Sequence, residues 1–311
     1  MHAGAAPAPG SMLMRVTDRV AETVILVALL GEVAAIFLNV LTRTFLDQSL
    51  LWTEEVARIA LSTLAFVGGV VAYRRNLHVF LRIVLDRMPA HVRRVCLTVA
   101  ETMVLGLSIV IFALSLTVVL AQWQRETPIL ELPASVFTIP LSLSMPLLAL
   151  YAADNLRRAD RSAMWLGVVL LAVIAIAVAG TRSSWLGSIG GDGAVSIALT
   201  VLLVGSCIGL PIGFGLLAAA ASYFWLTGTV PMVALPQKIV DGTSNFVLLA
   251  LPFFIFAGSI MEHGGISARL VRFVHALVGH FRGGLLQVMV VSMYLVSGLS
   301  GSKTADVAAV G

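Results

Sequence analysis

Long apolar runs separated by short charged segments extend over most of the chain. An α-helix needs about 20 mostly apolar residues to cross a bilayer. Runs of this length with few or no charged side chains lie at 23–42, 56–73, 102–122, 134–153 and 162–181. Each of these runs is predicted to form a membrane-spanning helix.

Residues 193–237 contain no Asp, Glu, Lys or Arg. At a rise of about 1.5 Å per residue this stretch is too long for one crossing, so it must fold back. The break is predicted at 209–215, where Pro211 and closely spaced glycines disfavour a continuous helix. A further span is predicted at 242–261, and a last apolar run covers 283–302. The pattern predicts an all-α, polytopic helical membrane protein with about eight transmembrane helices.

The composition supports this class. Hydrophobic residues make up 59% of the 311 residues and charged residues 12%, whereas soluble domains have about 45–50% and about 25%. A soluble enzyme is thereby excluded, and a porin-type barrel would need alternating strands of about ten residues. The net charge of +4 comes from short Arg clusters between apolar runs, so no nucleic-acid partner is expected and the bilayer is the predicted environment.

The Arg clusters predict the orientation of the chain. They alternate between loops and precede the first predicted span, separate the second from the third and follow the fourth: Arg15 and Arg19; Arg74, Arg75, Arg82, Arg87, Arg93 and Arg94; Arg157, Arg158 and Arg161. Loops rich in Lys and Arg face the cytoplasm. We therefore expect a cytoplasmic N-terminus, and eight crossings return the charged link 263–282 to the same side.

A change in composition near Asp160 predicts a domain boundary at 155–163. Loops before it are charged, whereas after it glycine is dense and charged residues are few. Residues 1–19 are expected to form a disordered cytoplasmic N-terminus, and residues 20–160 a four-helix scaffold domain.

The segment that opens the second span contains Trp52, Glu54, Glu55 and Arg58. Glu54 and Arg58 are spaced i,i+4, so an ion pair could lower the cost of placing Arg58 near the membrane. The segment is interpreted either as an interface anchor, with Trp52 at headgroup depth and both acids in water, or as a contact with another domain or a partner.

Two further groups of residues allow a functional and a structural interpretation. Glu32 and Asn39 share one face of the first span, and an intramembrane carboxylate is a functional candidate, although a polar contact between scaffold helices explains it as well. Gly205, Gly209 and Gly213 form a small-xxx-small series that favours close helix packing over ligand binding.

The segment Ser297–Asp306 is polar and begins about fifteen residues after Arg282, which at helical rise corresponds to the middle of the bilayer. Secondary transporters use broken helices with hydroxyl groups and free carbonyls at this depth to bind ions and substrates. The candidate substrate- and ion-binding residues are Ser300, Gly301, Ser302, Thr304 and Asp306. A phosphate loop is excluded because Gly-Lys-[Ser/Thr] is absent here.

These residues resemble a known transporter family. Trp52-x-Glu54-Glu55-x-x-Arg58, followed by Phe66-Val67-Gly68-Gly69, Arg74-Arg75 and His78, resembles the small four-helix permease subunit of tripartite ATP-independent periplasmic (TRAP) transporters. The chain from about Gly193 is similar to the start of the large permease subunit. The similar pieces are Leu251-Pro252-Phe253-Phe254, Ala257-Gly258, Gly264-Gly265-Ile266-Ser267, Gly279-His280-Phe281-Arg282-Gly283-Gly284, and Ser300-Gly301-Ser302 before Ala305-Asp306.

The resemblance implies a fused permease of the bacterial inner membrane. Residues 20–160 would be the small permease domain, 161–185 a connector helix, and 193–311 the N-terminal portion of the large transport domain, ending in the start of a re-entrant hairpin. The rest of the large subunit, in the same or a separate chain, would follow as a partner. Such permeases are not enzymes; they take carboxylate-bearing solutes from a periplasmic substrate-binding protein.

By the same resemblance, import is coupled to sodium and the large subunit moves as an elevator against a static small subunit. The loop around Ser300, Gly301, Ser302 and Asp306 would be the hairpin tip, with sodium at Ser300 and Ser302; no other cofactor is implied. Lys303 stands beside this loop, where its charge would oppose sodium unless it pairs with Asp306.

Two rival interpretations remain. The chain could be a scaffold that transports nothing itself and docks a separately encoded transport subunit; uptake by this chain alone would exclude that. An intramembrane enzyme would need a nucleophile and a base within the bilayer, whereas the predicted topology places the histidines in loops.

Overall fold

The computed structural model describes residues 12–75, 77, 85, 87–158, 169, 191–281 and 283–300. Apart from short connections, these residues are helical; outside the helices they form one isolated β-bridge, between Glu126 and Pro133. The predicted all-α fold is confirmed. The predicted connector 161–185 lies outside the described residues except for Val169.

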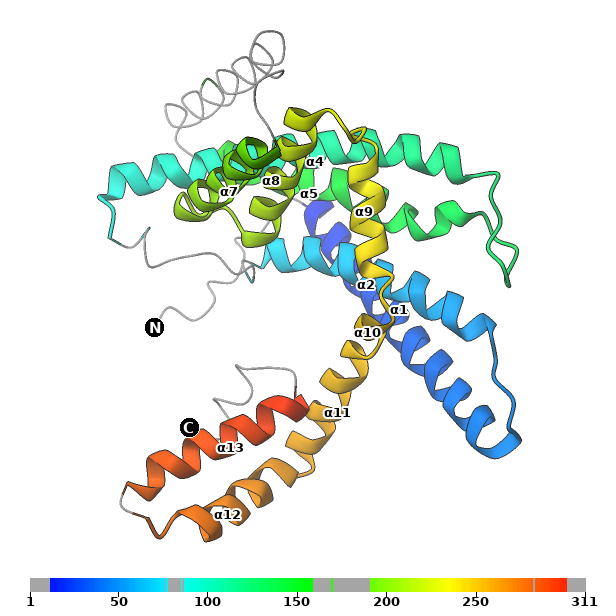
Figure 1. Cartoon of the computed structure of the whole chain (residues 1–311), viewed down its shortest axis with the longest axis vertical. Helices are drawn as coiled ribbons and strands as arrows, with labels where there is room; N and C mark the ends of the chain where they lie inside the picture. Colours follow the sequence, from blue (N-terminus) through cyan, green and yellow to red (C-terminus); the bar gives the residue numbers. More distant parts are fainter. Residues whose placement is uncertain are drawn as a thin grey trace.

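The first half of the chain forms a bundle of long helices (Figure 1). Its members are α1 (Met12–Leu46), α2 (Trp52–Arg74), α4 (Ala90–Gln122) and α5 (Ile139–Arg158), the last preceded by the 3-10 turn η1 (Ala134–Phe137). Four helical segments here are long and apolar enough to cross a membrane: 16–46, 52–74, 90–122 and 134–157. They correspond to the first four predicted spans.

The N-terminal prediction needs a correction. Helix α1 begins at Met12, so residues 12–19 are helical rather than disordered, and residues 1–11 lie outside the described part. The reason is tertiary: Asp18 Oδ1 accepts a 2.5 Å hydrogen bond from the Tyr151 hydroxyl on α5, and Arg74 on α2 lies 3.9 Å from Asp18 and 3.8 Å from Asp154. The same guanidinium lies 5.2 Å from the Tyr151 ring centre.

A second polar group ties α2, α4 and α5 together. The Tyr73 hydroxyl donates a hydrogen bond to the Glu101 carboxylate. The Asn155 side-chain amide donates to both oxygens of that carboxylate, each at a distance of 3.4 Å. Polar contacts of this kind hold membrane helices together because lipid supplies no hydrogen-bond partners of its own. The four helices are thus joined by side-chain bonds as well as by packing.

The long uncharged stretch does fold back, as predicted, into the hairpin of α7 (Gly191–Cys207) and α8 (Ile212–Thr227). The break is shorter than predicted: α8 begins at Ile212, so Gly213 and Gly215 belong to a helix. Pro211 stands at the N-cap of α8, where its missing N–H costs nothing.

Helices α8 and α9 (Ala234–Thr243) and the α7–α8 turn share the core of the long helices, and α7 packs against α8. Leu210 is fully buried in that core, and Leu235 and Val240 of α9 are buried beside it. The Phe214 ring meets the Tyr73 ring edge-on at 6.1 Å. In the following text, "the bundle" denotes α1, α2, α4, α5 and α7–α9.

The predicted continuous span 242–261 is wrong. The chain forms α9, then α10 (Phe246–Leu249) and α11 (Leu251–His263), with breaks at residues 244–245 and 250. Pro252 stands in the first turn of α11 and has no N–H to donate. A helix continuing from α10 into α11 would lack this backbone hydrogen bond, so the two helices stay separate.

The charged link 263–282 also contains a helix, α12 (Ile266–Val278), which packs against α13 (Gly284–Ser300). In Figure 1 the three helices α11–α13 project away from the bundle and are attached through α10. Leu248 and Leu249 of α10 pack against Ala57 and Leu61 of α2 and Ile36 of α1. We call α11–α13 the projecting region.

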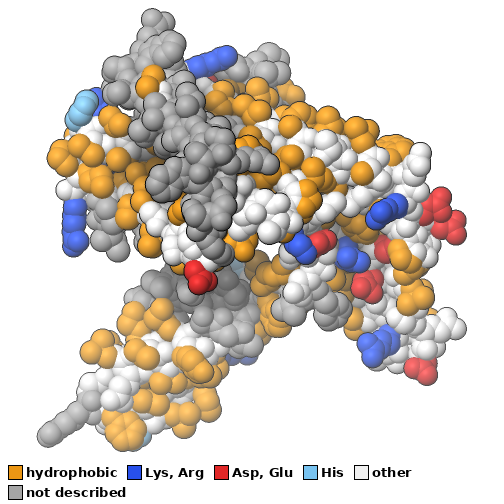
Figure 2. Space-filling view, turned by 45° about the horizontal axis from the view of Figure 1, so that its top comes forward, with side chains coloured by type: hydrophobic (Ala, Val, Ile, Leu, Met, Phe, Trp, Pro, Cys, Tyr) orange, Lys and Arg blue, Asp and Glu red, His pale blue; other side chains and the backbone are white. Residues whose placement is uncertain are grey.

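Apolar side chains cover much of the outer surface, as Figure 2 shows for one face. Leu120, Leu143 and Leu203 are each about two-thirds exposed. A surface of this kind is typical of helices that face lipid, because a soluble monomer rarely exposes large contiguous apolar patches.

Candidate functional site

Glu55 is buried inside the protein rather than exposed to water. Its carboxylate accepts hydrogen bonds from the backbone N–H groups of Ile129 and Leu130, at 3.1 and 3.0 Å. These residues belong to the loop between α4 and η1, which folds back over the first turn of α2. The prediction that both acids face water holds for Glu54, which is exposed, and is wrong for Glu55, which is 4% exposed.

The predicted pair between Glu54 and Arg58 is not formed: the ion pairs among the described residues do not include it. The Arg58 guanidinium lies instead 5.2 Å from the ring centre of Phe137 in η1. The reason is again tertiary, because η1 packs against α2 and brings the partly buried Phe137 ring within reach of Arg58. Trp52, at the first position of α2, is 38% exposed, as an interface anchor would be.

Arg58 also borders a small polar cavity of about 120 Å³ between α2, η1 and α9. Gln122 and Thr138 line one side and Asp241 the other. Within the described structure the buried Arg58 Nε has no hydrogen-bond partner. The motif 52–58 therefore contributes to a contact between the N-terminal helices and α9, in line with the inter-domain interpretation.

Gly209 allows the α7–α8 turn to approach Leu85 and Leu97 closely. Its φ of +90° is in the region that favours glycine. A Cβ there would lie 3.1 Å from both Cδ atoms of Leu85 and 3.4 Å from Leu97 Cδ2. Gly213, by contrast, faces open space. The close approach between α7 and α8 occurs at Gly215, beside Leu202, whereas Gly205 lies against Leu210 of the turn.

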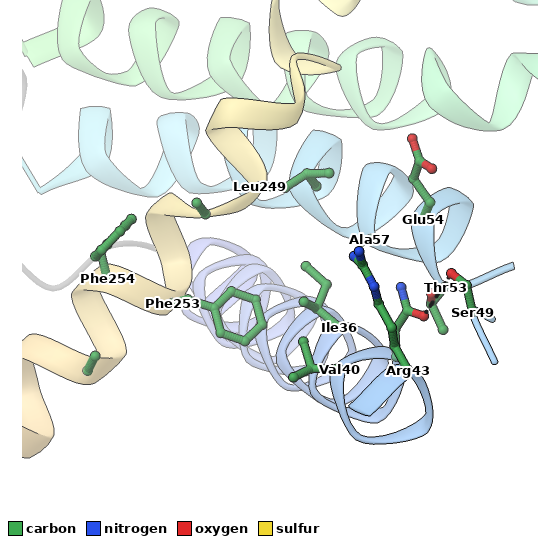
Figure 3. Close-up of a pocket in the computed structure, with 13 residues that line it drawn as sticks. Ile36, Val40, Arg43, Ser49, Thr53, Glu54, Ala57, Leu249, Phe253 and Phe254 are labelled. Carbon is green, nitrogen blue, oxygen red and sulfur yellow. Dashed lines mark hydrogen bonds between the residues drawn. The ribbon is translucent and has the colours of Figure 1, made fainter. Parts of the chain in front are cut away.

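A larger cavity of about 580 Å³ separates the end of α1 and the start of α2 from α10 and α11 (Figure 3). Asn39 shapes its polar end: its Oδ1 accepts hydrogen bonds from the Leu50 N–H, at 3.0 Å, and the Ser49 hydroxyl, at 3.4 Å. Asn39 thus ties the end of α1 to the loop that leads into α2.

Glu32 does not share that role. It is fully buried, and neither carboxylate oxygen has a hydrogen-bond partner in the described structure. Sequence reasoning singled out Glu32 and Asn39 as a pair but did not identify Arg43, which lines the cavity beside Asn39. The signal was present: Arg43 follows Asn39 by four residues on the same helical face.

Most of the predicted ion-binding loop lies outside the described residues. Ser300 is the last residue of α13, and Gly301, Ser302, Thr304 and Asp306 are not described. Within the described residues, no group of three or more His, Cys, Asp or Glu side chains could hold a metal ion. The predicted sodium site therefore stays a prediction.

Two family matches cover most of the chain. Residues 32–162 match the family described as "Tripartite ATP-independent periplasmic transporters, DctQ component". Residues 199–311 match "Tripartite ATP-independent periplasmic transporter, DctM component". The chain belongs to the TRAP transporter permeases. It joins a region similar to the small permease subunit to one similar to the large subunit.

Individual relatives of this TRAP permease agree with the fusion. The sialic acid TRAP transporter permease protein SiaT of Haemophilus influenzae (strain 86-028NP) is 28% identical over 288 residues, 88% of this chain and 46% of the relative. The isethionate TRAP transporter permease protein DctMQ of Oleidesulfovibrio alaskensis is 26% identical over 266 residues, 84% of this chain and 41% of the relative.

The large-subunit region also matches separate large permeases. The 2,3-diketo-L-gulonate TRAP transporter large permease protein YiaN of Escherichia coli (strain K12) is 48% identical over 118 residues, 38% of this chain and 28% of the relative. The chain thus spans less than half the length of each of these relatives. Their names are those of permeases, which agrees with the prediction that this chain is not an enzyme.

Proposed function

We propose that this TRAP permease takes part in the import of a carboxylate-bearing solute that a periplasmic binding protein delivers. Its place would be the bacterial inner membrane, with the N-terminus in the cytoplasm, as the Arg clusters predict. The matched relatives are named for sialic acid, isethionate and 2,3-diketo-L-gulonate, all organic anions. A solute with an acidic group is therefore the class that this family favours.

We further propose that the import is driven by sodium through an elevator movement. One observation carries this part: α8, α9 and the α7–α8 turn share a core with the long helices, whereas α11–α13 are attached to the bundle mainly through α10. A transport domain that moves against a fixed scaffold needs this division, with a short joint between a rigid part and a displaceable part.

The sodium site of this proposal begins at Ser300, the last residue of α13, and continues into the segment that follows. Ser300, Gly301, Ser302, Thr304 and Asp306 supply hydroxyl, carbonyl and carboxylate oxygens, the donor types that hard cations prefer. The remainder of the large permease, in the same or another chain, would complete the site, because binding sites of such transporters lie between two repeats.

The test is uptake by proteoliposomes that contain the permease purified from its native membranes together with its binding protein. The double variant Ser300→Ala/Asp306→Asn is compared with the matched variant Ser196→Ala/Asp192→Asn, whose residues are exposed at the start of α7. Because loss of groups that support an ion site typically costs about 10- to 100-fold in ion affinity, we expect the first variant to need far more sodium and the control to behave as wild type.

Unchanged sodium dependence in the Ser300/Asp306 variant would overturn the site. The rival function, a scaffold that docks a separate transport subunit, predicts a different result. In that case uptake would require a second purified polypeptide, and this double variant would have no effect on it. The packing of α8 and α9 against the long helices is the observation that favours a docking role for that part.

A further inference from the structure

The cavity between α1, α2, α10 and α11 has a polar end and an apolar end. Asn39, Arg43, Ser49, Thr53 and Glu54 line the end near the α1–α2 loop. Apolar residues line the rest: Ile36, Val40, Ala57, Leu249, Phe253 and Phe254. Its volume of about 580 Å³ falls within the range of about 300–1,000 Å³ that is usual for pockets that bind small molecules.

Arg43 is the cation of the polar end, which Glu54 also lines. Arg43 lies in the last turn of α1 and, within the described structure, belongs to none of the ion pairs. In Figure 3 the Arg43 side chain reaches from α1 toward Ala57 on α2, whereas the Glu54 carboxylate points away from it. The Asn39 Oδ1 is engaged by the loop, and among the described residues the amide NH₂ of Asn39 has no acceptor, so it is left to donate. The ligand that suits this end is an anion with oxygen acceptors.

The apolar and polar ends of the cavity lie one after the other along the axis of α1. From Ile36 to Arg43 the helix rises about 10 Å at about 1.5 Å per residue, so the apolar end lies deeper in the bundle than the polar end. Arg43 precedes the loop that joins two long membrane helices, and Arg at a helix end places its charge at the level of the lipid headgroups. The cavity is therefore matched to a molecule that is anionic at headgroup depth and apolar beneath it.

We propose that this cavity binds a membrane phospholipid. The phosphate contacts Arg43 and the Asn39 amide, and one acyl chain lies between Ile36 on α1 and Phe253 and Phe254 on α11. Basic pockets between membrane helices recognise lipid headgroups in this way. The lipid would fill the seam between the bundle and the projecting region, where the side chains of the described residues leave space. This proposal does not depend on which solute is transported.

The test is native mass spectrometry of the intact permease released from detergent, with bound phospholipid counted by mass. Three variants are compared with wild type: Arg43→Ala removes the cation, Arg43→Lys keeps the charge, and Ala257→Phe fills the apolar end, which Ala257 lines. The matched control is Arg125→Ala, an exposed Arg in the α4–η1 loop outside the cavity. Added phosphatidylglycerol vesicles supply the lipid for titration.

We expect one bound phospholipid on wild type and on Arg125→Ala. Arg43→Ala should bind the lipid at least about tenfold more weakly, which corresponds to a loss of about 1.4 kcal/mol. Arg43→Lys should bind with intermediate affinity. Ala257→Phe should lose the lipid although it keeps Arg43. Loss of lipid from this variant therefore cannot result from misfolding caused by removal of Arg43. Equal lipid occupancy in wild type, Arg43→Ala and Ala257→Phe would overturn the proposal. So would release of the bound mass by inorganic phosphate, which would identify a site for a free anion.

Discussion

The bundle and the projecting region differ in how their helices are held together. In the bundle, hydrogen bonds and ion pairs connect side chains of different helices, as between Tyr151 and Asp18 or Tyr73 and Glu101. In the described part of α11–α13, the side-chain hydrogen bonds stay within one helix: His263 bonds to the Ser259 carbonyl and Arg272 to the Ala268 carbonyl.

This difference has a physical consequence. In an apolar environment a buried polar pair locks two helices in one arrangement, because separating them leaves both groups without partners. Helices held by van der Waals packing alone can shift at lower cost, since each contact is weak and easily replaced. The bundle therefore has the character of a fixed scaffold and α11–α13 that of a displaceable unit.

The largest effect is expected for Gly209→Ala, which would loosen α7–α9 from the long helices. The positive φ and the contact with Leu85 should together cost about 2–3 kcal/mol. Thermal unfolding of the purified protein in detergent measures the loss. Gly213→Ala, on the open side of α8, is the control and should be neutral; equal stability of both variants would show that the turn is not docked as described.

Glu55→Ala should be next in size. The N–H groups of Ile129 and Leu130 would lose their acceptor, and the α4–η1 loop would detach from α2. We expect a loss of about 2 kcal/mol, within the range for removing a charged hydrogen-bond acceptor. Limited proteolysis of the loop and thermal unfolding both report it. The neighbouring exposed Glu54→Ala serves as control, and a comparable loss there would contradict the assignment.

Tyr151→Phe removes one polar tie of the bundle while keeping the ring. The Asp18 carboxylate would lose the hydroxyl donor but keep Arg74 nearby, so the expected cost is about 1 kcal/mol. Tyr294→Phe in α13, where the side chain is exposed, is the matched control in the projecting region. A loss that is equal in the two variants would remove the distinction between the regions.

The smallest effect is expected for Ser292→Ala in α13. The hydroxyl is buried, and in the described structure it has no hydrogen-bond partner. Removing it should change the free energy of unfolding by less than about 0.5 kcal/mol or stabilise the protein slightly. A loss above 1 kcal/mol by thermal unfolding would reveal a polar tie within the projecting region and weaken the comparison.

Much of the helix pattern could be predicted, because membrane helices are encoded in local runs of apolar residues. The four long helices and the break near Pro211 follow from composition and from proline and glycine chemistry. The interruption at residue 250 was missed since the apolar run continues through it, although Pro252 was a visible signal. The ion-binding loop 300–306 was predicted from its polar sequence at membrane depth and awaits the uptake test.

The sequence by itself determined the class of the protein, the positions of its long helices and the family resemblance that the DctQ and DctM matches support. Only the tertiary structure decided the partners of individual polar residues. Glu55 bonds to a loop more than seventy residues away, and Arg58 turns to Phe137 instead of Glu54. The reason is that apolar periodicity acts locally along the chain, whereas a buried polar group takes whichever partner the folded helices bring within reach.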